Sequence, residues 1–322
     1  MRIVYVIEKL STIGGMERVL TDKMNYLAAH TAHEVVLMLV WHDPLPPAYP
    51  LHERIAVLRL GVPYVRGGLT LPLALLRYNR YIRRLRPRCT VLTWVFGAFA
   101  ATFGTHCGKT IYELHRPAQK MKHRWLQKLM QRRTDCIVTL TKTDAACYPR
   151  ARHVAVIPNF TDMHFSAAPD YSAKVVVSAG RDIPEKDFPR LRRLWDSLRP
   201  GHPDWQLHVH HSTPDMAAAY LEGSVYAMTS RFEGFPMVLI EAMRCGLPLI
   251  AFDCPNGPRD IIEDGVTGYL IPYDDDDKYI NRLNYLMEHP EAREQLGRAA
   301  RKASERYLPA PIMSQWLKLF LS

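Results

Sequence analysis

The chain of 322 residues is 48% hydrophobic and 23% charged, which indicates a globular protein with enough residues for one large or two ordinary domains. Its net charge of +10 is uneven: residues 1–160 carry 24 Lys/Arg and 9 Asp/Glu, or +15, and the remainder carries 18 and 23, or −5. The basic first half is expected to meet something anionic. Because no nucleic-acid-binding motif is present, we expect a membrane surface or a lipid-linked phosphate and no nucleic acid.

The N-terminus and the cysteines indicate a cytoplasmic chain. Residues 1–10 have a strand pattern and lack the basic region, apolar core and cleavage site of a signal peptide. The uncharged stretch 89–108 contains four Thr and three Gly, so we interpret it as a strand, a loop and a buried helix and not as a membrane span. The six cysteines show no C-x-x-C spacing, and reduced, mostly buried thiols are expected.

Short β-branched runs alternate with longer helical stretches along the first half, a pattern typical of parallel α/β structure. Strands are predicted at 3–7, 34–40, 55–58, 90–94, 110–112, 136–140 and 154–157. Helices are predicted at 15–29, 71–85, 121–133 and 143–148.

A polar break at 159–172 precedes a second alternating series, so we predict two doubly wound units joined near residue 165. Its strands are predicted at 174–178, 206–210, 225–228 and 248–252. Its helices are predicted at 188–198, 214–222, 236–245, 259–263, 279–288, 291–307 and 311–320. The acidic run 274–277 is predicted to be a solvated loop.

The stretch SRFEGFPMVLIEAMRCG (230–246) follows an apolar strand and opens a helix, with Pro236 at its first position. Glu233 and Gly234 then fall at the carboxyl end of a strand, where α/β sheets bind ligands. The free N–H groups of the helix start suit phosphate or sugar oxygens. Glu241 lies one to two turns further, so the two carboxylates can reach different parts of one ligand. On spacing alone, it is equally possible that Glu233 caps the helix and that Glu241 is a surface charge without a ligand.

Three other strand ends carry weaker features. SAGRDIPEK (178–186) places Arg181 and Lys186 where they could straddle a diphosphate, although such basic pairs are usually solvated. STIGGMERV (11–19) contains a Gly-Gly pair that either approaches a ligand closely or forms a tight turn.

YELHRP (112–117) places His115 just past a strand, where a single histidine is more often structural. Two further features are also expected to be structural. The histidines at 208, 210 and 211 lack a further ligand set that would complete a metal site, and Cys254 in a Pro/Gly turn lacks an activating base.

The pattern S-R-x-E-G-F-P-M-V-x-x-E-A-M closely resembles the signature of family 4 retaining glycosyltransferases. The following CGLPLIAFDCPNGPRDIIEDGVTGYLI is similar to the subgroup that builds bacterial capsular and lipopolysaccharide glycans. This resemblance covers nearly the whole chain and implies a GT-B fold, in which two Rossmann-like doubly wound domains face each other across a cleft. Residues 1–165 would form the acceptor-side domain, 166–305 the nucleotide-sugar domain, and 306–322 a helix that can cross back to the first domain.

The resemblance also implies roles for the matched residues. Glu233 and His115 would act on the transferred sugar as catalytic residues, and Glu241 would hold the ribose hydroxyls. Arg181 and Lys186 would stabilise the leaving diphosphate in place of a metal, because no D-x-D motif is evident and no metal is expected. The other donor-binding positions would be Gly14, Gly15, Gly234, Phe235, Pro236 and Met237.

One region, 209–225, departs from the family pattern. The family usually carries a loop, a helix, a strand and another helix there, and HHSTPDMAAAYLEGS bridges the gap in a single step. About 30 residues, the size of a strand-and-helix unit, are missing. We therefore expect a shortened C-terminal sheet that lacks the segment with which the family normally helps to recognise the nucleobase.

The sequence thus predicts a retaining, metal-independent hexosyltransferase without a cofactor, which uses a nucleoside-diphosphate sugar and a lipid-linked or saccharide acceptor. The alternative is a non-catalytic nucleotide-sugar-binding or scaffold subunit of a membrane-associated transferase complex. The basic segments 74–88 and 119–133 are interleaved with aromatic and aliphatic residues. They predict amphipathic helices that dock on the inner face of the plasma membrane. The alternative, packed helices with a solvated charged face, is equally consistent with the pattern.

Overall fold

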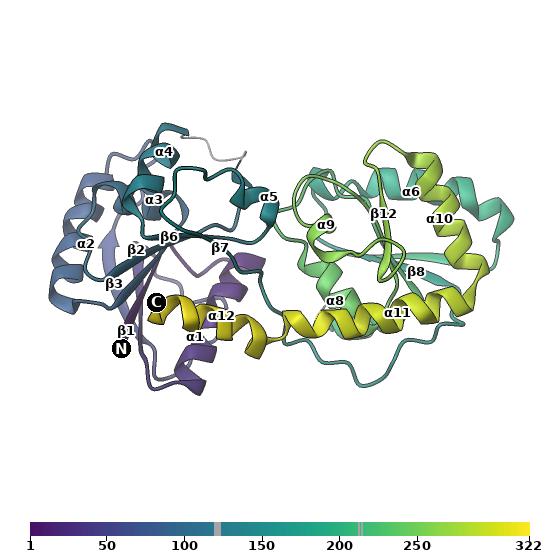
Figure 1. Cartoon of the computed structure of the whole chain (residues 1–322), viewed down its shortest axis with the longest axis horizontal. Coiled ribbons are helices and arrows are strands. Elements are labelled where there is room, and N and C mark those ends of the chain that lie inside the picture. Colours follow the sequence, from purple (N-terminus) through teal and green to yellow (C-terminus); the bar gives the residue numbers. More distant parts are fainter. Residues whose placement is uncertain (119–123, 212, 214) are drawn as a thin grey trace. The chain divides into compact units, whose positions relative to one another are not determined.

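The computed structural model describes residues 1–118, 124–211, 213 and 215–322. These residues form two compact units: unit 1 is Met1–Pro158 with Pro309–Ser322, and unit 2 is Asn159–Leu308 (Figure 1). Each unit has its own parallel sheet and its own hydrophobic core. The prediction of two Rossmann-like doubly wound units is confirmed.

Unit 1 contains a seven-stranded parallel sheet in the order β3-β2-β1-β4-β5-β6-β7. Its β-branched runs are almost fully buried in β1, β4 and β6, as expected for a parallel sheet covered on both faces. The strands are β1 (Arg2–Ile7), β2 (Glu34–Trp41), β3 (Ala56–Val62), β4 (Cys89–Thr93), β5 (Lys109–Glu113), β6 (Cys136–Thr139) and β7 (Val154–Val156).

The helices of unit 1 include one that comes from the far end of the chain. They are α1 (Gly15–His30), α2 (Leu71–Leu85), α3 (Trp94–Phe103), α4 (Arg124–Arg133), α5 (Lys142–Ala145) and α12 (Pro309–Leu321). The α12 helix packs on α1, and the Lys109 ammonium donates to the Leu319 carbonyl at 2.7 Å. The start of the predicted helix 121–133 lies outside the described residues. In 89–108 the helix α3 follows β4 directly, without the expected loop.

Unit 2 contains a five-stranded parallel sheet in the order β12-β11-β10-β8-β9. A single helix, α7, joins β9 to β10, so the expectation of a shortened sheet agrees with the described part of this region. The strands are β8 (Val175–Ala179), β9 (Gln206–His210), β10 (Val225–Met228), β11 (Leu249–Phe252) and β12 (Gly268–Ile271). The helices are α6 (Phe188–Leu198), α7 (Met216–Leu221), α8 (Met237–Cys245), α9 (Pro258–Ile261), α10 (Asp276–Glu288) and α11 (Pro290–Ser304).

Two features of unit 2 differ from the sequence-based prediction. The prediction of a solvated loop over 274–277 holds for Asp274 and Asp275 and is wrong for the other two residues, because α10 begins at Asp276 and the Asp275 side chain caps it by accepting from the Lys278 N–H at 2.9 Å. Carboxylates stabilise a helix N-terminus, which explains why an acidic run begins a helix here. Strand β12 was not predicted, because its four-residue run GYLI starts at a glycine.

All six cysteines are free, and four of them are buried. Among the described residues, no helix combines the length and apolar composition needed to cross a bilayer.

Candidate active site

The sheet of unit 2 places two loops at one topological switch point. Strands β8 and β10 are neighbours, but the chain leaves β8 toward β9 on one side and continues from β10 to β11 and β12 on the other. Ligands of open α/β sheets bind at the carboxyl ends of the strands where the order reverses. The loops that leave β8 and β10 here carry the motifs predicted at 178–186 and 230–246.

These two loops are joined by an ion pair between predicted site residues. The Lys186 ammonium lies 2.7 Å from Glu233 Oε1, with only 15% and 11% of the two side chains exposed. The Glu233 N–H donates to the Pro255 carbonyl at 3.1 Å, which fixes the backbone of the turn. Gly180 has a φ of 152°, and a Cβ there would lie 3.1 Å from Lys186 Cε, so glycine leaves room for the lysine to fold over the strand end.

Helix α8 begins beside this ion pair with an uncapped N-terminus. Pro236 is its N-cap, so the helix begins one residue later than predicted, and no side chain of the described residues caps it. Its first N–H groups are therefore available to ligand oxygens. Gly257, at φ 101°, packs closely here, since a Cβ would meet Pro236 Cδ at 2.3 Å. The remaining predicted positions line the same turn: Phe235 is buried, and Gly234 and Met237 are half-buried.

Glu241 is held by a tyrosine that the sequence analysis did not single out. The Tyr220 hydroxyl donates to Glu241 Oε2 at 2.8 Å, which joins α7 to α8. Tyr220 is fully buried, and burial followed by the charge of Glu241 raises its pKa, so the hydroxyl remains a donor. The carboxylate itself is half-buried at the surface of α8. Glu241 is thus oriented by the protein and still accessible.

Arg181 and Cys254 complete the description of this region. Arg181 follows Gly180 at the end of β8 and its side chain is exposed, so it is brought to the same strand end as Lys186. Burial, followed by the nearby Glu233 carboxylate, raises the pKa of the Cys254 thiol to about 12. Such a thiol is not nucleophilic at neutral pH, which supports the structural role expected for it.

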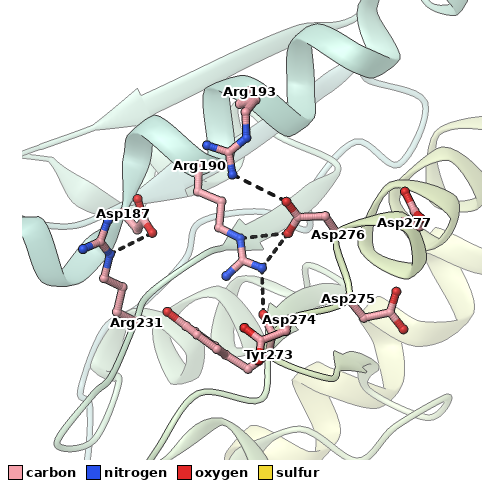
Figure 2. A pocket seen from close by; sticks show the side chains of 9 residues that line it. All are labelled: Asp187, Arg190, Arg193, Arg231, Tyr273, Asp274, Asp275, Asp276 and Asp277. Atoms are coloured by element: carbon pink, nitrogen blue, oxygen red, sulfur yellow. Dashed lines mark hydrogen bonds and ion pairs between the residues drawn. The ribbon is translucent and has the colours of Figure 1, made fainter.

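A separate pocket of unit 2, of about 570 Å³, is lined by charged residues of α6, of the loop after β10 and of the start of α10 (Figure 2). Arg190 donates through Nε to Asp276 at 2.8 Å and through Nη2 to the Tyr273 carbonyl at 2.7 Å. Arg231 donates to Asp187 at 2.9 Å. Both arginines donate to neighbouring acceptors, and the contacts of Arg190 join α6 to the start of α10.

Unit 1 has its own pocket at the corresponding switch point, where β1 and β4 are neighbours and their connections diverge. It encloses about 450 Å³. Its lining mixes charged residues with aromatic and aliphatic ones: Glu8, Lys9, Thr12, Met16, Glu17, Trp94, Val95, Ala98, Tyr112, Glu113, Leu114, His115, Arg116 and Leu126. A pocket with apolar walls and a few polar groups suits a sugar ring with its hydroxyls.

His115 belongs to a buried triad at the end of β5. Its Nε2 lies 3.1 Å from Glu113 Oε1, and the Lys23 ammonium of α1 contacts the same oxygen. The three side chains are at most 2% exposed. Burial alone would raise the pKa of Glu113, but Lys23 and His115 lower it to about 2. The Trp316 ring of α12 covers the Lys23 ammonium, 4.7 Å from the ring centroid.

The strand β4 joins α3 through a strained residue in the pocket wall. Trp94 has a φ of 60°, a conformation that costs a bulky residue about 1–3 kcal/mol and is concentrated at functional sites. The Tyr112 hydroxyl holds it by donating to the Trp94 carbonyl at 2.9 Å. The Glu8 carboxylate accepts from the Phe96 N–H at 2.8 Å and stabilises the start of α3.

The Gly-Gly pair lies at the start of α1. A Cβ at Gly14 would meet Glu17 Oε2 at 2.4 Å, and the Glu17 carboxylate also accepts from the Thr12 hydroxyl at 2.7 Å. Nothing lies within 4 Å of a Cβ at Gly15, so the space there is open. A Cβ at Gly14 would therefore displace only the far end of the flexible Glu17 side chain, so neither glycine is required by the fold of the loop itself.

The sequence predicted the site residues themselves, but not the residues that pair with them in the structure. The sequence pattern could have indicated Lys23, because it falls on the apolar face of α1 between Leu20 and Leu27, where a charged residue needs a buried partner. Glu113 had a similar signal at the end of an apolar strand. Tyr220 had none, since its partner Glu241 lies 21 residues away on another helix.

Both units match glycosyltransferase families. Residues 13–165 match the family model "Glycosyltransferase Family 4", and residues 206–303 match "Glycosyl transferases group 1". The amylovoran biosynthesis glycosyltransferase AmsD of Erwinia amylovora is 24% identical, over 98% of this chain and 98% of that protein.

Solved structures share the fold. The apo form of the lipopolysaccharide outer core galactosyltransferase WaaB has a TM-score of 0.81 at 17% identity, over 99% of this chain and 98% of that one. Anabaena Alr3699/HepE in complex with UDP-glucose has a TM-score of 0.72 at 17% identity, over 99% of both chains. The chain therefore has the GT-B fold, and its family matches are those of a glycosyltransferase.

Proposed function

We propose that this glycosyltransferase moves a hexose, with retention of configuration, from a nucleoside-diphosphate sugar to a saccharide or lipid-linked acceptor in cell-surface glycan synthesis. The observation that carries the proposal is the ion pair of Lys186 with Glu233 at the switch point of unit 2, beside the uncapped start of α8. A donor of the UDP-sugar or GDP-sugar class carries an anionic diphosphate and a hydroxylated sugar, which match these two groups.

Donor binding would exchange the partners of this ion pair. Diphosphate oxygens would compete for the Lys186 ammonium and also contact the exposed Arg181, so that Glu233 is released to accept from sugar hydroxyls. The two cations would stabilise the leaving diphosphate without a metal. Glu241, held by Tyr220, would accept from the two ribose hydroxyls. The diphosphate would depart on the face that the acceptor hydroxyl attacks.

The pocket of unit 1 would receive a sugar beside His115. Its imidazole is held in place by Glu113, which suits a group that must present a fixed hydrogen bond to a hydroxyl. Gly15 at the start of α1 leaves open space for phosphate oxygens near backbone N–H groups. No cofactor is required by this scheme.

We further propose peripheral attachment to the cytoplasmic face of an anionic membrane. On α2, Leu73 and Leu76 are 39% and 68% exposed and share a helical face with the exposed Arg80 and Arg83. On α4, Trp125 is 56% exposed. Exposed apolar side chains next to arginines are typical of surfaces that insert shallowly into anionic lipid. The segment 119–123, part of the second basic segment, lies outside the described residues.

The alternative, a non-catalytic nucleotide-sugar-binding or scaffold subunit, needs none of the paired carboxylates. Two experiments separate the readings. The first is a thermal-shift screen with UDP, GDP and their sugars. We expect the nucleotides of one base, uracil or guanine, to raise the unfolding temperature, because a ligand that binds only the folded state stabilises it. A donor-hydrolysis assay with EDTA present should then release free sugar. Binding without hydrolysis or transfer would favour the non-catalytic subunit, and binding of no nucleotide would contradict the transferase.

A further inference from the structure

We infer that unit 2 binds one divalent transition-metal ion, best matched by Zn²⁺, through His208, His210 and Glu222. The two histidines lie on the edge strand β9, two residues apart, so their side chains leave the same face of the sheet. Glu222 is the C-cap of α7. One nitrogen from each histidine and one carboxylate oxygen lie within 4.8 Å of one another.

The two distances from the Glu222 carboxylate are close to the ligand spacing of a tetrahedral zinc site. Glu222 Oε2 lies 2.8 Å from His208 Nδ1 and 3.2 Å from His210 Nε2. Bonds of about 2.0–2.1 Å to zinc place neighbouring ligand atoms roughly 3.4 Å apart, so the contact to His208 needs to open by about 0.6 Å and the contact to His210 by about 0.2 Å. Two imidazoles and a carboxylate are ligands that zinc accepts, with water as the fourth.

The hydrogen bonding of His208 is compatible with a bound cation. Its Nε2 lies 3.0 Å from Gln206 Oε1 and its Nδ1 lies 2.8 Å from Glu222 Oε2, so both ring nitrogens face acceptor oxygens. A neutral imidazole carries one N–H and can satisfy one of the two. If Nε2 donates to Gln206, the Nδ1 lone pair faces the carboxylate and a metal ion fits between them. Gln206 then orients the ligand in the way that outer partners orient metal-bound histidines.

The site is reachable and would join two elements that meet only weakly. The side chains of His208, His210 and Glu222 are 36%, 23% and 43% exposed, so an ion can enter from solvent. In the described sheet β9 pairs with β8 alone, and the metal would hold it to α7. None of the three ligands is among the residues proposed to bind the donor, so this inference does not rest on the proposed function.

The test is a titration of the full chain with ZnCl₂, in which calorimetry measures binding and thermal unfolding measures the change in stability. We expect one saturable site per chain and a higher unfolding temperature. His210→Ala and Glu222→Gln each remove a ligand and should weaken binding by about 10–100-fold or more. His211→Ala is the matched control, because His211 is the exposed neighbour and no contact joins it to the cluster in the described residues. It should bind as the unmodified chain does.

Cobalt substitution gives a readout that does not depend on stability. Co²⁺ bound by two imidazoles, a carboxylate and water should show the visible absorption of a tetrahedral site, and this absorption should disappear in His208→Asn, which keeps a side chain of similar polarity. The inference is overturned if the unmodified chain shows no saturable binding at millimolar Zn²⁺. It is also overturned if His211→Ala weakens binding as much as His210→Ala does.

Discussion

The two units hold their functional charges in opposite ways. In unit 1, Lys23, Glu113 and His115 are buried and paired before any ligand arrives. In unit 2, Lys186 and Glu233 are paired but retain contact with solvent, and Arg181 is exposed. Separating a fully buried pair leaves an unsolvated charge, whereas a pair near solvent can exchange partners at little cost. Substitutions in unit 1 should therefore act first on stability, and those in unit 2 on donor binding and turnover.

The largest effect is expected from Lys23→Met. It leaves the buried Glu113 carboxylate without its ammonium partner, and breaking a buried pair in this way costs about 3–5 kcal/mol of the free energy of unfolding. Denaturant unfolding measures the loss. The double variant Lys23→Met with Glu113→Leu removes both charges and should regain most of the stability. Equal losses in the single and double variants would show that the pair contributes nothing beyond its packing.

Acid should weaken unit 1 through the same pair. The pKa of Glu113 is about 2 in the folded chain, below its ordinary value, so its ionised form contributes stability that is present above roughly pH 4.5 and is lost as the pH falls toward 2. Unfolding followed between pH 6 and 2.5 should show this loss, and the Lys23→Met, Glu113→Leu variant should show a smaller one. Identical pH slopes for the two proteins would place the acid sensitivity elsewhere.

Glu233→Gln should lower turnover by roughly 100-fold, because an amide cannot replace a carboxylate that stabilises charge on the sugar. The affinity for the nucleotide should change much less, because the proposed partner of Glu233 is the sugar. Comparing kcat with the dissociation constant for the free nucleotide separates the two effects. A mutant that turns over normally would remove Glu233 from the catalytic role.

Glu241→Ala and Arg181→Ala should each weaken donor binding about tenfold or more, because each removes a charge-assisted contact worth about 1.5–3 kcal/mol. Calorimetry with the nucleotide measures this, and unfolding should stay unchanged for Arg181→Ala because its side chain is exposed. Tyr220→Phe is a finer test, since it frees Glu241 without removing it and should cost less than Glu241→Ala. Unchanged affinity in the first two variants would contradict both assignments.

The smallest effect per residue is expected at the membrane. Each arginine near an anionic surface contributes on the order of 1 kcal/mol, screened beyond about 8 Å at physiological salt. Replacing Arg83, Arg84, Lys122 and Arg124 with neutral residues should weaken co-sedimentation with anionic vesicles and leave nucleotide affinity intact. Binding that does not fall with salt, or that is equal on zwitterionic vesicles, would leave the charge of residues 1–160 without this explanation.

The sequence was sufficient for the parallel strands other than β12 and for the residues at the strand ends, because apolar runs and strand-to-helix turns are local patterns. It was insufficient where a role depends on a partner far along the chain. Lys186 and Glu233 were predicted separately, and only the strand order brings them to 2.7 Å. Glu222 was absent from the prediction at His208 and His210 because it approaches them through the fold of α7 onto β9.

The return of α12 to unit 1 has a consequence for the order of events during synthesis. The strands of unit 1 leave the ribosome first, but Trp316, which covers the Lys23 ammonium, is made only after all of unit 2. Until then the nascent first unit contains a charged side chain in a core that is not yet closed, while unit 2 has all its residues and can fold as a unit. The half of the chain that begins first is therefore the half that is completed last.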